Sequence, residues 1–336
     1  MVTVQDINDT WADESNGIIA AIISFFFNVA LIFATSRVKI YNESVKRMQI
    51  FACVLRLLFS TSIVLSSPTL AYITEAEAVY IVKGGFKLPI WLGTVILITF
   101  ITFVIFSCMG PPMQFLQVLL IVKKNVRYQK NIVFFTTLAS FLVAFTATIL
   151  LYIGYTPDIS DDRLSQEIVY NLNGKGQSAY LIASLERFDY ALDDWVPDPI
   201  SWICTLYILL VLVLSTVISL VCWVMIRCQI GKGIASSNSV KVQLQLTTVL
   251  VVQFTIPFLT IHIPFYFSFI MPLFRIETSL VSIYLPYLFS WCPALNPIVV
   301  LIMVKSIREK IFVRPKRNSL KNSSAANVNI KAKSKG

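Results

Sequence analysis

Charged residues are scarce in this chain of 336 residues. They make up 14% of it, where soluble domains carry about a quarter, while apolar residues reach 56%. A globular core could not hide so large an apolar excess. The composition therefore excludes an ordinary soluble protein and indicates one embedded in a membrane.

Seven apolar stretches are each long enough to cross a bilayer, which takes about 20 residues. They cover residues 17–36, 48–73, 88–122, 131–155, 199–226, 244–271 and 280–304. Polar loops join them, and no internal repeat is visible. We therefore expect an all-α membrane protein, a seven-transmembrane helix bundle over residues 17–304, whose long third span tilts or breaks at Pro111 and Pro112.

Basic residues are divided unevenly between the two sides of these spans. With the N-terminus outside, the inner segments hold 21 basic and two acidic residues, and the outer segments hold six basic and sixteen acidic ones. Positive residues in short loops stay in the cytoplasm. We therefore expect residues 1–16 outside the cell and the C-terminus inside. The net charge of +10 then reflects an inner face that suits anionic membrane lipids, and no nucleic-acid partner is expected.

None of the eighteen acidic residues falls within an expected span. Proton-coupled transporters use intramembrane carboxylates, and secondary transporters show repeated halves with paired broken helices. Neither is visible, nor is the filter loop or charged ring of a channel. The pattern favours a receptor, with a transporter or ligand-gated channel of the same topology as the alternative. A small neutral or volatile ligand is favoured, unless an outer acid such as Asp193 or Asp194 supplies a counter-ion.

The chain also lacks the side-chain groupings of an enzyme. Its six cysteines and single histidine have no metal-site spacing, and no nucleophile–base pair accompanies that histidine. We expect no catalysis, no metal and no cofactor.

Two polar residues within the spans each have two interpretations. Arg56, the one charge clearly inside a span, either snorkels toward the inner headgroups or bonds polar groups in the bundle and stabilises one receptor state. His262 lies between Pro257 and Pro264, which free backbone carbonyls and favour a bend in the sixth helix. It either bonds a freed carbonyl or lines a ligand cavity.

The seventh span contains a similar weak point. Pro293 and Pro297 free backbone groups that neighbouring helices can satisfy, and Asn296 offers an amide for bonds between helices. Such a point can hold two packings of similar energy. The candidate switch residues are Arg56, Pro257, Pro264, Asn296 and Pro297.

Aromatic residues gather near the outer ends of the spans. They are either interface anchors or, where they face inward, part of an apolar ligand pocket. Together with the histidine, the candidate ligand-binding residues are Trp91, Trp202, Tyr207, His262, Tyr266, Tyr284 and Tyr287.

The segments outside the spans carry three further expectations. The stretch LIASLERFDYAL, residues 181–192, predicts a short amphipathic helix over the outer mouth. Asn8 begins a glycosylation acceptor, Asn8-Asp9-Thr10, on the outer side. After the seventh span, residues 305–314 predict a short amphipathic helix on the inner leaflet, and residues 315–336 a disordered basic tail in the cytoplasm.

The stretch QLQLTTVLVVQFTIPFLTIHIPFYFSFIMPLF resembles the sixth span of nematode serpentine chemoreceptors of the Str superfamily (Str, Srd, Srh, Sri and Srj groups). The spacing of Gln253 and Pro257 carries the likeness. In the seventh span, Pro293, Ala294, Asn296, Pro297 and Lys305 match the family pattern. The third span lacks the family's aromatic-Arg-Tyr ending, since its first arginine is Arg127.

This resemblance implies a chemosensory G-protein-coupled receptor in the plasma membrane, in sensory cilia, with a heterotrimeric G protein as its partner. The basic residues expected to face that partner are Lys123, Lys124, Arg127, Lys241, Lys305 and Arg308. Because the arginine motif is missing, the resemblance does not extend to a standard arginine switch. The seventh span contains no lysine, which excludes a retinal Schiff base.

Overall fold

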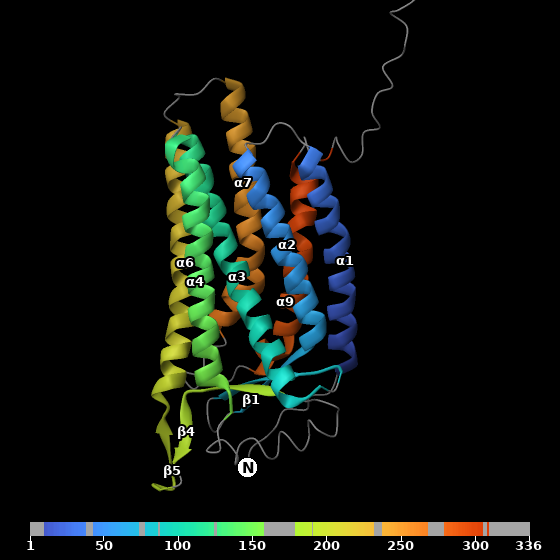
Figure 1. Ribbon diagram of the computed structural model, residues 1–336, viewed down its shortest axis with the longest axis vertical. Coiled ribbons are helices and arrows are strands. Elements are labelled where there is room, and N and C mark those ends of the chain that lie inside the picture. Colours follow the sequence, from blue (N-terminus) through green and yellow to red (C-terminus); the bar gives the residue numbers. More distant parts are fainter. Residues whose placement is uncertain are drawn as a thin grey trace, which may run out of the picture.

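Seven long helices run side by side in the computed structural model of the chain (Figure 1), and each is long and apolar enough to cross a membrane. They are α1 (Thr10–Arg37), α2 (Glu43–Ser66), α3 (Ile90–Val122), α4 (Val126–Tyr155), α6 (Pro199–Gly231), α7 (Ser237–Pro257) and α9 (Ser279–Met303). The structure describes residues 10–37, 43–73, 78–86, 88–123, 126–157, 179–189, 191–231, 237–267, 279–304 and 308. The expected seven-helix class is confirmed.

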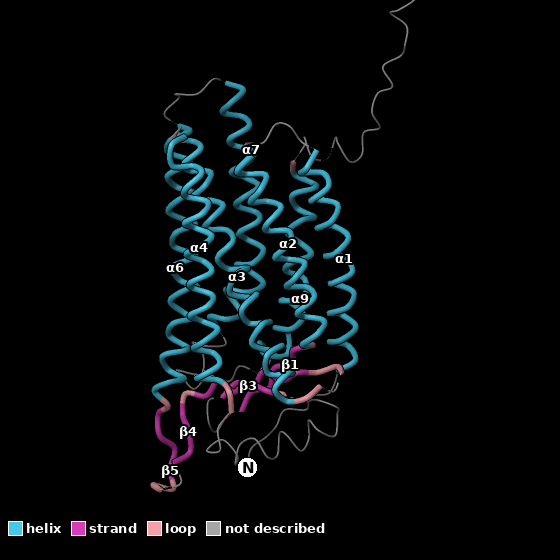
Figure 2. The backbone as a smooth tube through the Cα atoms, viewed as in Figure 1, coloured by secondary structure: helices cyan, strands magenta, loops and turns pink. Residues whose placement is uncertain are grey.

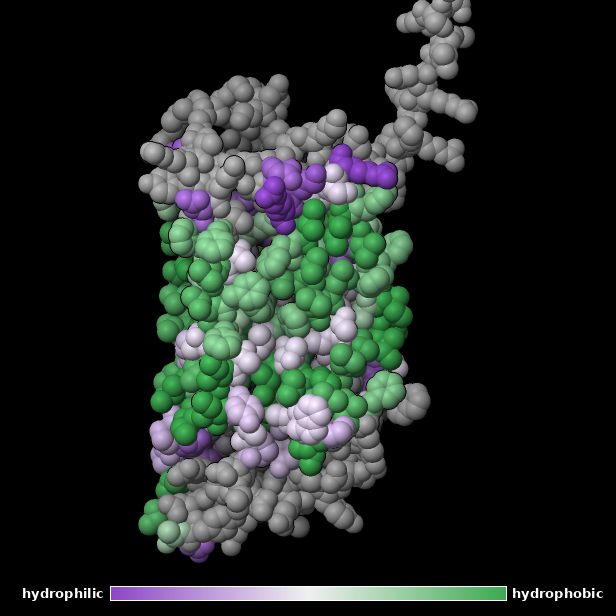
Figure 3. All heavy atoms as spheres, in the orientation of Figure 1, coloured by the Kyte–Doolittle hydropathy of each residue, from purple (hydrophilic) through white to green (hydrophobic). Residues whose placement is uncertain are grey.

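The outer surface of the bundle is apolar. Large side chains such as Phe26, Phe145 and Leu214 are exposed on α1, α4 and α6. Hydrophobic residues form a broad band across the visible face, with hydrophilic residues next to the loops (Figure 3). Water would penalise this surface by roughly 25 cal/mol for each Å², whereas lipid does not.

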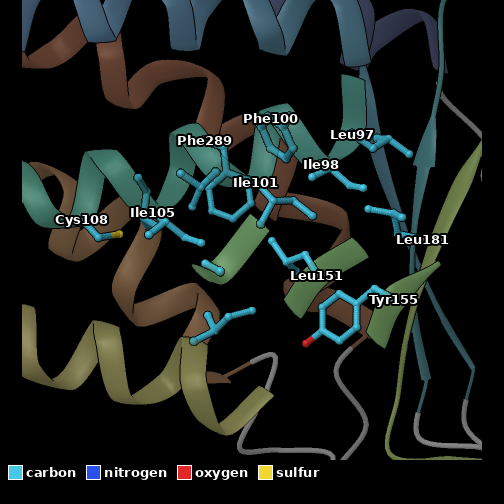
Figure 4. Close-up of a cluster of buried hydrophobic side chains, with 14 of the residues drawn as sticks. Leu97, Ile98, Phe100, Ile101, Ile105, Cys108, Leu151, Tyr155, Leu181 and Phe289 are labelled. Atoms are coloured by element: carbon cyan, nitrogen blue, oxygen red, sulfur yellow. The ribbon is translucent and has the colours of Figure 1, made fainter. Parts of the chain in front are cut away.

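Helix α3 lies at the centre of the bundle, because it contacts α2, α4, α6 and α7. Its apolar side chains form the main core with those of its neighbours. Figure 4 shows Leu97 and Ile101 of α3 beside Leu151 and Tyr155 of α4, with Leu181 of a loop strand at the edge of the same cluster. The core therefore ties the loop strands to the helices.

Two small β-sheets cover one end of the bundle (Figure 2). The first is antiparallel with the order β1 (Pro68–Ile73), β2 (Ala78–Lys83), β3 (Tyr180–Ser184), and the second is the hairpin of β4 (Glu186–Asp189) and β5 (Asp194–Pro197). The expectation of a helix over residues 181–192 is wrong, because those residues form β3, β4 and a turn. Residues 180–184 pair with the edge of β2 that β1 does not use, and this edge offers backbone partners that a helix could not use.

The sheet also shortens the second helix. The expected span of residues 48–73 continues into what is β1, whereas α2 ends at Ser66. Ser67 has a φ of 39°, and the proline at position 68 disfavours helical geometry in the residue before it. The chain therefore leaves the helix and enters the hairpin.

Some expectations fall outside the described residues. These are the glycosylation site at Asn8, the tail over residues 315–336 and, apart from Arg308, the inner amphipathic helix over residues 305–314. They stay predictions.

Helices α4 and α6 approach closely at Gly154. The Ser201 hydroxyl donates to the Gly154 carbonyl oxygen at 2.9 Å, and the Cys204 thiol donates to the Leu150 carbonyl oxygen at 2.7 Å. A Cβ atom on Gly154 would lie 2.7 Å from the Cys204 sulfur. The absence of a side chain at this position permits the close packing.

Gly154→Ala should lower the free energy of unfolding by about 1–3 kcal/mol, because the added methyl overlaps Cys204 and pushes the helices apart. The matched control is Gly110→Ala in α3, where a Cβ meets nothing within 4 Å and alanine favours the helix. Thermal unfolding of the purified proteins in detergent checks this. Equal midpoints for Gly154→Ala and the wild type would contradict the packing argument.

Candidate functional site

A proline within a helix leaves the backbone carbonyl four residues earlier without its usual donor, and at two of these prolines a neighbouring helix supplies one. Pro297 cannot bond the Pro293 carbonyl oxygen, which accepts a hydrogen bond from Asn28 Nδ2 at 3.1 Å. Pro112 likewise frees the Cys108 carbonyl oxygen, which accepts from the Ser215 hydroxyl at 2.5 Å. Hydrogen bonds therefore join α9 to α1 and α3 to α6 at these proline positions, although α9 and α3 are each continuous helices.

The tie at Asn28 belongs to a buried polar cluster that joins three helices. Asn28 Nδ2 also donates to the Ser24 carbonyl oxygen at 2.8 Å and approaches the Ser24 hydroxyl at 3.1 Å. The Ser60 hydroxyl of α2 donates to that same hydroxyl at 2.6 Å. These hydrogen bonds join α1, α2 and α9 at the level of Pro293.

A central cavity of about 50 Å³ lies where α2, α3, α7 and α9 meet. It brings together three of the five expected switch residues, Arg56, Pro257 and Asn296. Pro264 and Pro297 do not line it. The full lining is Ala52, Leu55, Arg56, Phe103, Phe106, Ser107, Gly110, Pro111, Gln114, Gln253, Pro257, Cys292, Pro293 and Asn296.

Arg56 is half-buried and lies midway along its span. It follows Val45, where its span begins, by 11 residues, which is about 16 Å along a helix. A hydrocarbon core is about 30 Å thick, so this depth is near its middle. The guanidinium Nη1 lies 3.8 Å from the Cys53 sulfur, which is a weak acceptor.

A second cavity, of about 40 Å³, lies nearer the α1–α2 and α3–α4 loops. It is lined by Thr35, Val45, Lys46, Met48, Gln49, Gln114, Gln117, Val118, Leu246, Val249, Leu250, Gln253, Val300 and Val304. We call this the inner cavity. Gln114 and Gln253 line both the central and the inner cavity, so these two amides form the boundary between them.

Helix α7 continues into a π-helical turn, Phe258–His262, enclosed by Pro257 and Pro264. π-turns are frequent at functional sites because they break the regular helical ladder. His262 is fully buried, and a hydrogen bond of 3.1 Å links its Nδ1 to the Thr216 hydroxyl of α6. The same hydroxyl lies 3.4 Å from that of Tyr266. The turn is therefore fastened to α6.

The expected ligand-binding residues do not form one site. Trp91 and Tyr284 are 68% and 62% exposed, as interface anchors would be. Tyr207 donates to the Val143 carbonyl oxygen at 3.1 Å and so faces α4. The structure brings together His262 and Tyr266, with ring centroids 6.2 Å apart, while Trp202 and Tyr287 are half-buried elsewhere.

A cavity of about 320 Å³ opens between α1, α2, α9 and the start of β1, at the end of the bundle that the strands cover. We call this the outer cavity. It is lined by Glu14, Gly17, Ile18, Ile63, Val64, Ser67, Pro68, Gly85, Phe86, Pro286 and Ser290. This size is in the range of small-molecule sites, and the lining combines apolar side chains with a few polar groups, as such sites do.

The Glu14 carboxylate of the outer cavity already has partners. Its Oε1 accepts from the Gly85 backbone N–H at 3.0 Å. Nearby, Lys83 is buried and its ammonium donates to the carbonyl oxygens of Gly84 and Phe86. Burial lowers the pKa of Lys83, and the charge of Glu14 partly offsets that effect. The carboxylate thus helps to hold the loop beside the cavity.

The basic residues expected to face a G protein are described in part. Lys123 at the end of α3 and Arg308 are exposed, and Arg308 Nη1 donates to the Ile302 carbonyl oxygen at 3.0 Å. Arg127 lies near the start of α4, and Lys241 lies near the start of α7. Lys124 and Lys305 fall outside the described residues.

Four residues that line these cavities or bond one helix to another are not among the predicted site residues. Gln114, Gln253, Asn28 and Thr216 are uncharged polar residues within apolar stretches. Their isolation in such stretches was the available signal, because a buried polar group in lipid needs a partner. The predicted site residues are instead charges, prolines and aromatic residues, together with His262 and Asn296.

Comparisons with known proteins place these features in context. The family model described as "Serpentine type 7TM GPCR chemoreceptor Str" matches residues 14–312. The crystal structure of squid rhodopsin is similar, with a TM-score of 0.57 and 15% sequence identity, over 91% of this chain and 86% of that chain. At that identity the likeness concerns the fold alone. The comparison with curated proteins finds no match.

Asn28→Leu should lower the free energy of unfolding by about 1–3 kcal/mol, because it leaves the Pro293 carbonyl buried without its side-chain donor. Ser36→Ala on the same helix is the control, since its exposed hydroxyl bonds only the Phe33 carbonyl oxygen and its loss should cost less than about 0.5 kcal/mol. Thermal unfolding in detergent measures both. An Asn28→Leu protein that melts with the wild type would show that α1 does not stabilise the break in α9.

Proposed function

The chain belongs to the Str family of serpentine seven-transmembrane G-protein-coupled chemoreceptors, and we propose that it detects a small neutral or volatile molecule at the plasma membrane. In this proposal, it signals by rearranging its sixth and seventh helices, α7 and α9. The N-terminus is outside in this proposal, so that the strands and the outer cavity face the source of the ligand. The basic inner loops then face the cytoplasm.

The ligand binds in the outer cavity in this proposal. Ile63, Phe86 and Pro286 offer apolar contact, while Ser67 and Ser290 are small polar residues beside them. The Ser290 hydroxyl already donates to the Pro286 carbonyl oxygen at 2.7 Å, which leaves its lone pairs for a ligand donor. A small molecule with one or two polar groups fits this lining.

The observation that carries the proposal is that α9 lines all three cavities. Pro286 and Ser290 lie in the outer cavity, Asn296 in the central cavity and Val300 in the inner cavity. Between them, Pro293 and Pro297 weaken the helix. A ligand that displaces the outer part of α9 would therefore change the packing around the central cavity.

Helix α7 would carry the change to the cytoplasm. Gln253 and Pro257 line the central cavity, and the π-turn that follows is a break at which the helix can pivot. Movement of the inner half of α7 away from α3 would widen the inner cavity at Gln114 and Gln253. A widened cavity beside Lys46 and Lys123 would suit an acidic segment of a heterotrimeric G protein.

Reconstitution of the purified chain in lipid with candidate heterotrimeric G proteins tests this function. Volatile and other small neutral compounds are screened for nucleotide exchange, and current across the same membrane is recorded without G protein. Ligand-evoked exchange without current is the expected result. Robust ligand-evoked current without a G protein would instead identify a channel or transporter.

Gln253→Leu should reduce maximal ligand-evoked nucleotide exchange at least tenfold, because an apolar side chain favours the closed boundary by about 1.4 kcal/mol or more. Thr255→Val on the same helix is the control, since its exposed hydroxyl bonds only the Val251 carbonyl oxygen within α7. Nucleotide exchange is normalised to the amount of reconstituted receptor. Wild-type levels of ligand-evoked nucleotide exchange in Gln253→Leu would show that Gln253 does not control the boundary between the central and inner cavities.

A further inference from the structure

The central cavity contains a positive charge that no acidic side chain offsets. Its lining includes Arg56 but no aspartate or glutamate, and within the described part of the chain Arg56 forms no ion pair. A charge near the middle of a membrane is costly unless it is paired. A negative partner bound beside Arg56 would therefore lower the electrostatic free energy of this charge.

Further hydrogen-bond donors surround this charge. Gln253 is only 4% exposed, it lines the cavity, and its Nε2 has no hydrogen-bond partner among the described residues. Asn296 Nδ2 makes only a long contact of 3.4 Å, to the Cys292 carbonyl oxygen. Both residues line the cavity that Arg56 also lines. Neutral acceptors such as Asn296 Oδ1 can bond the guanidinium but cannot neutralise it.

The space fits a small guest. The cavity has about 50 Å³, and a cavity needs about 10–15 Å³ to hold one water molecule. A halide ion with a water molecule or two can enter, whereas an organic acid of several carbon atoms cannot.

We propose that the central cavity binds a small monovalent inorganic anion of the size of chloride, held by the Arg56 guanidinium and the amide N–H groups of Gln253 and Asn296. The anion neutralises the charge of the half-buried Arg56 and bridges α2, α7 and α9. It stabilises the folded packing of these helices against unfolding, whether or not a ligand or G protein is present. Failure of the receptor function would therefore leave this site testable on its own.

Titration of the purified full chain with chloride tests the site. The chain is placed in nanodiscs of uncharged phosphatidylcholine, and chloride replaces gluconate at constant ionic strength while the thermal midpoint is recorded. A bound anion should raise the midpoint by several degrees and saturate, because a ligand that binds only the folded state stabilises it. A wild-type midpoint that does not respond to chloride overturns the proposal.

Two variants assign the response to the cavity. Arg56→Gln should lose the chloride dependence and should melt in gluconate at or above the wild-type midpoint, since no charge remains in the cavity. Gln253→Leu keeps the charge and should raise the chloride dissociation constant at least tenfold. Arg37→Gln is the matched control, because Arg37 is exposed at the end of α1 and stacks on Phe33. It should keep the full response.

Two outcomes contradict the assignment. One is an unchanged chloride response in Arg56→Gln, and the other is its loss in Arg37→Gln. Should Arg56→Gln not fold, Arg56→Lys serves the same comparison, because it keeps the charge without the planar fork of donors. Its chloride dissociation constant should rise at least tenfold, and an unchanged value would overturn the proposal.

Discussion

Lipid offers no hydrogen bonds, so each backbone carbonyl that a proline frees must find its donor within the bundle. This constraint organises the structure. Asn28 of α1 and Ser215 of α6 supply donors at the breaks in α9 and α3. Each of these two hydrogen bonds holds a proline position against a neighbouring helix. The helix therefore keeps a defined geometry there although one of its own backbone hydrogen bonds is missing. The polar cluster around Ser24 extends the first tie to α2.

The same breaks set the positions of the cavities. The outer cavity contacts α9 before Pro293, the central cavity surrounds Pro257 and Pro293, and the inner cavity lies beyond them. Gln114 and Gln253 separate the last two. A series of cavities along weakened helices is an arrangement in which binding at one end can favour a second packing at the other.

The sequence predicted the parts of the fold that depend on lipid. Seven apolar stretches specify seven spans because each must be long enough to cross the bilayer. Arg56, Pro257 and Asn296 were chosen as polar or breaking residues in apolar surroundings, and the structure places them around one cavity. The role of that cavity stays a proposal.

The sequence did not predict features that depend on distant partners. Residues 181–192 have a helix-like pattern, but Leu181 and its neighbours pair with β2, about a hundred residues earlier. Exposure of Trp91 and Tyr284 depends on which way each helix is rotated, and a single span does not reveal that rotation.

In the proposed mechanism, the inner half of α7 moves away from α3 when the receptor is active. Spin labels at Lys123→Cys and Thr248→Cys, two exposed positions on these helices, measure it in a chain whose exposed Cys228 is replaced by serine. Pulsed electron paramagnetic resonance gives the distance between the labels with and without a G protein that the receptor activates. The account predicts a longer distance in the complex. An unchanged distance in a complex that still exchanges nucleotide would contradict it.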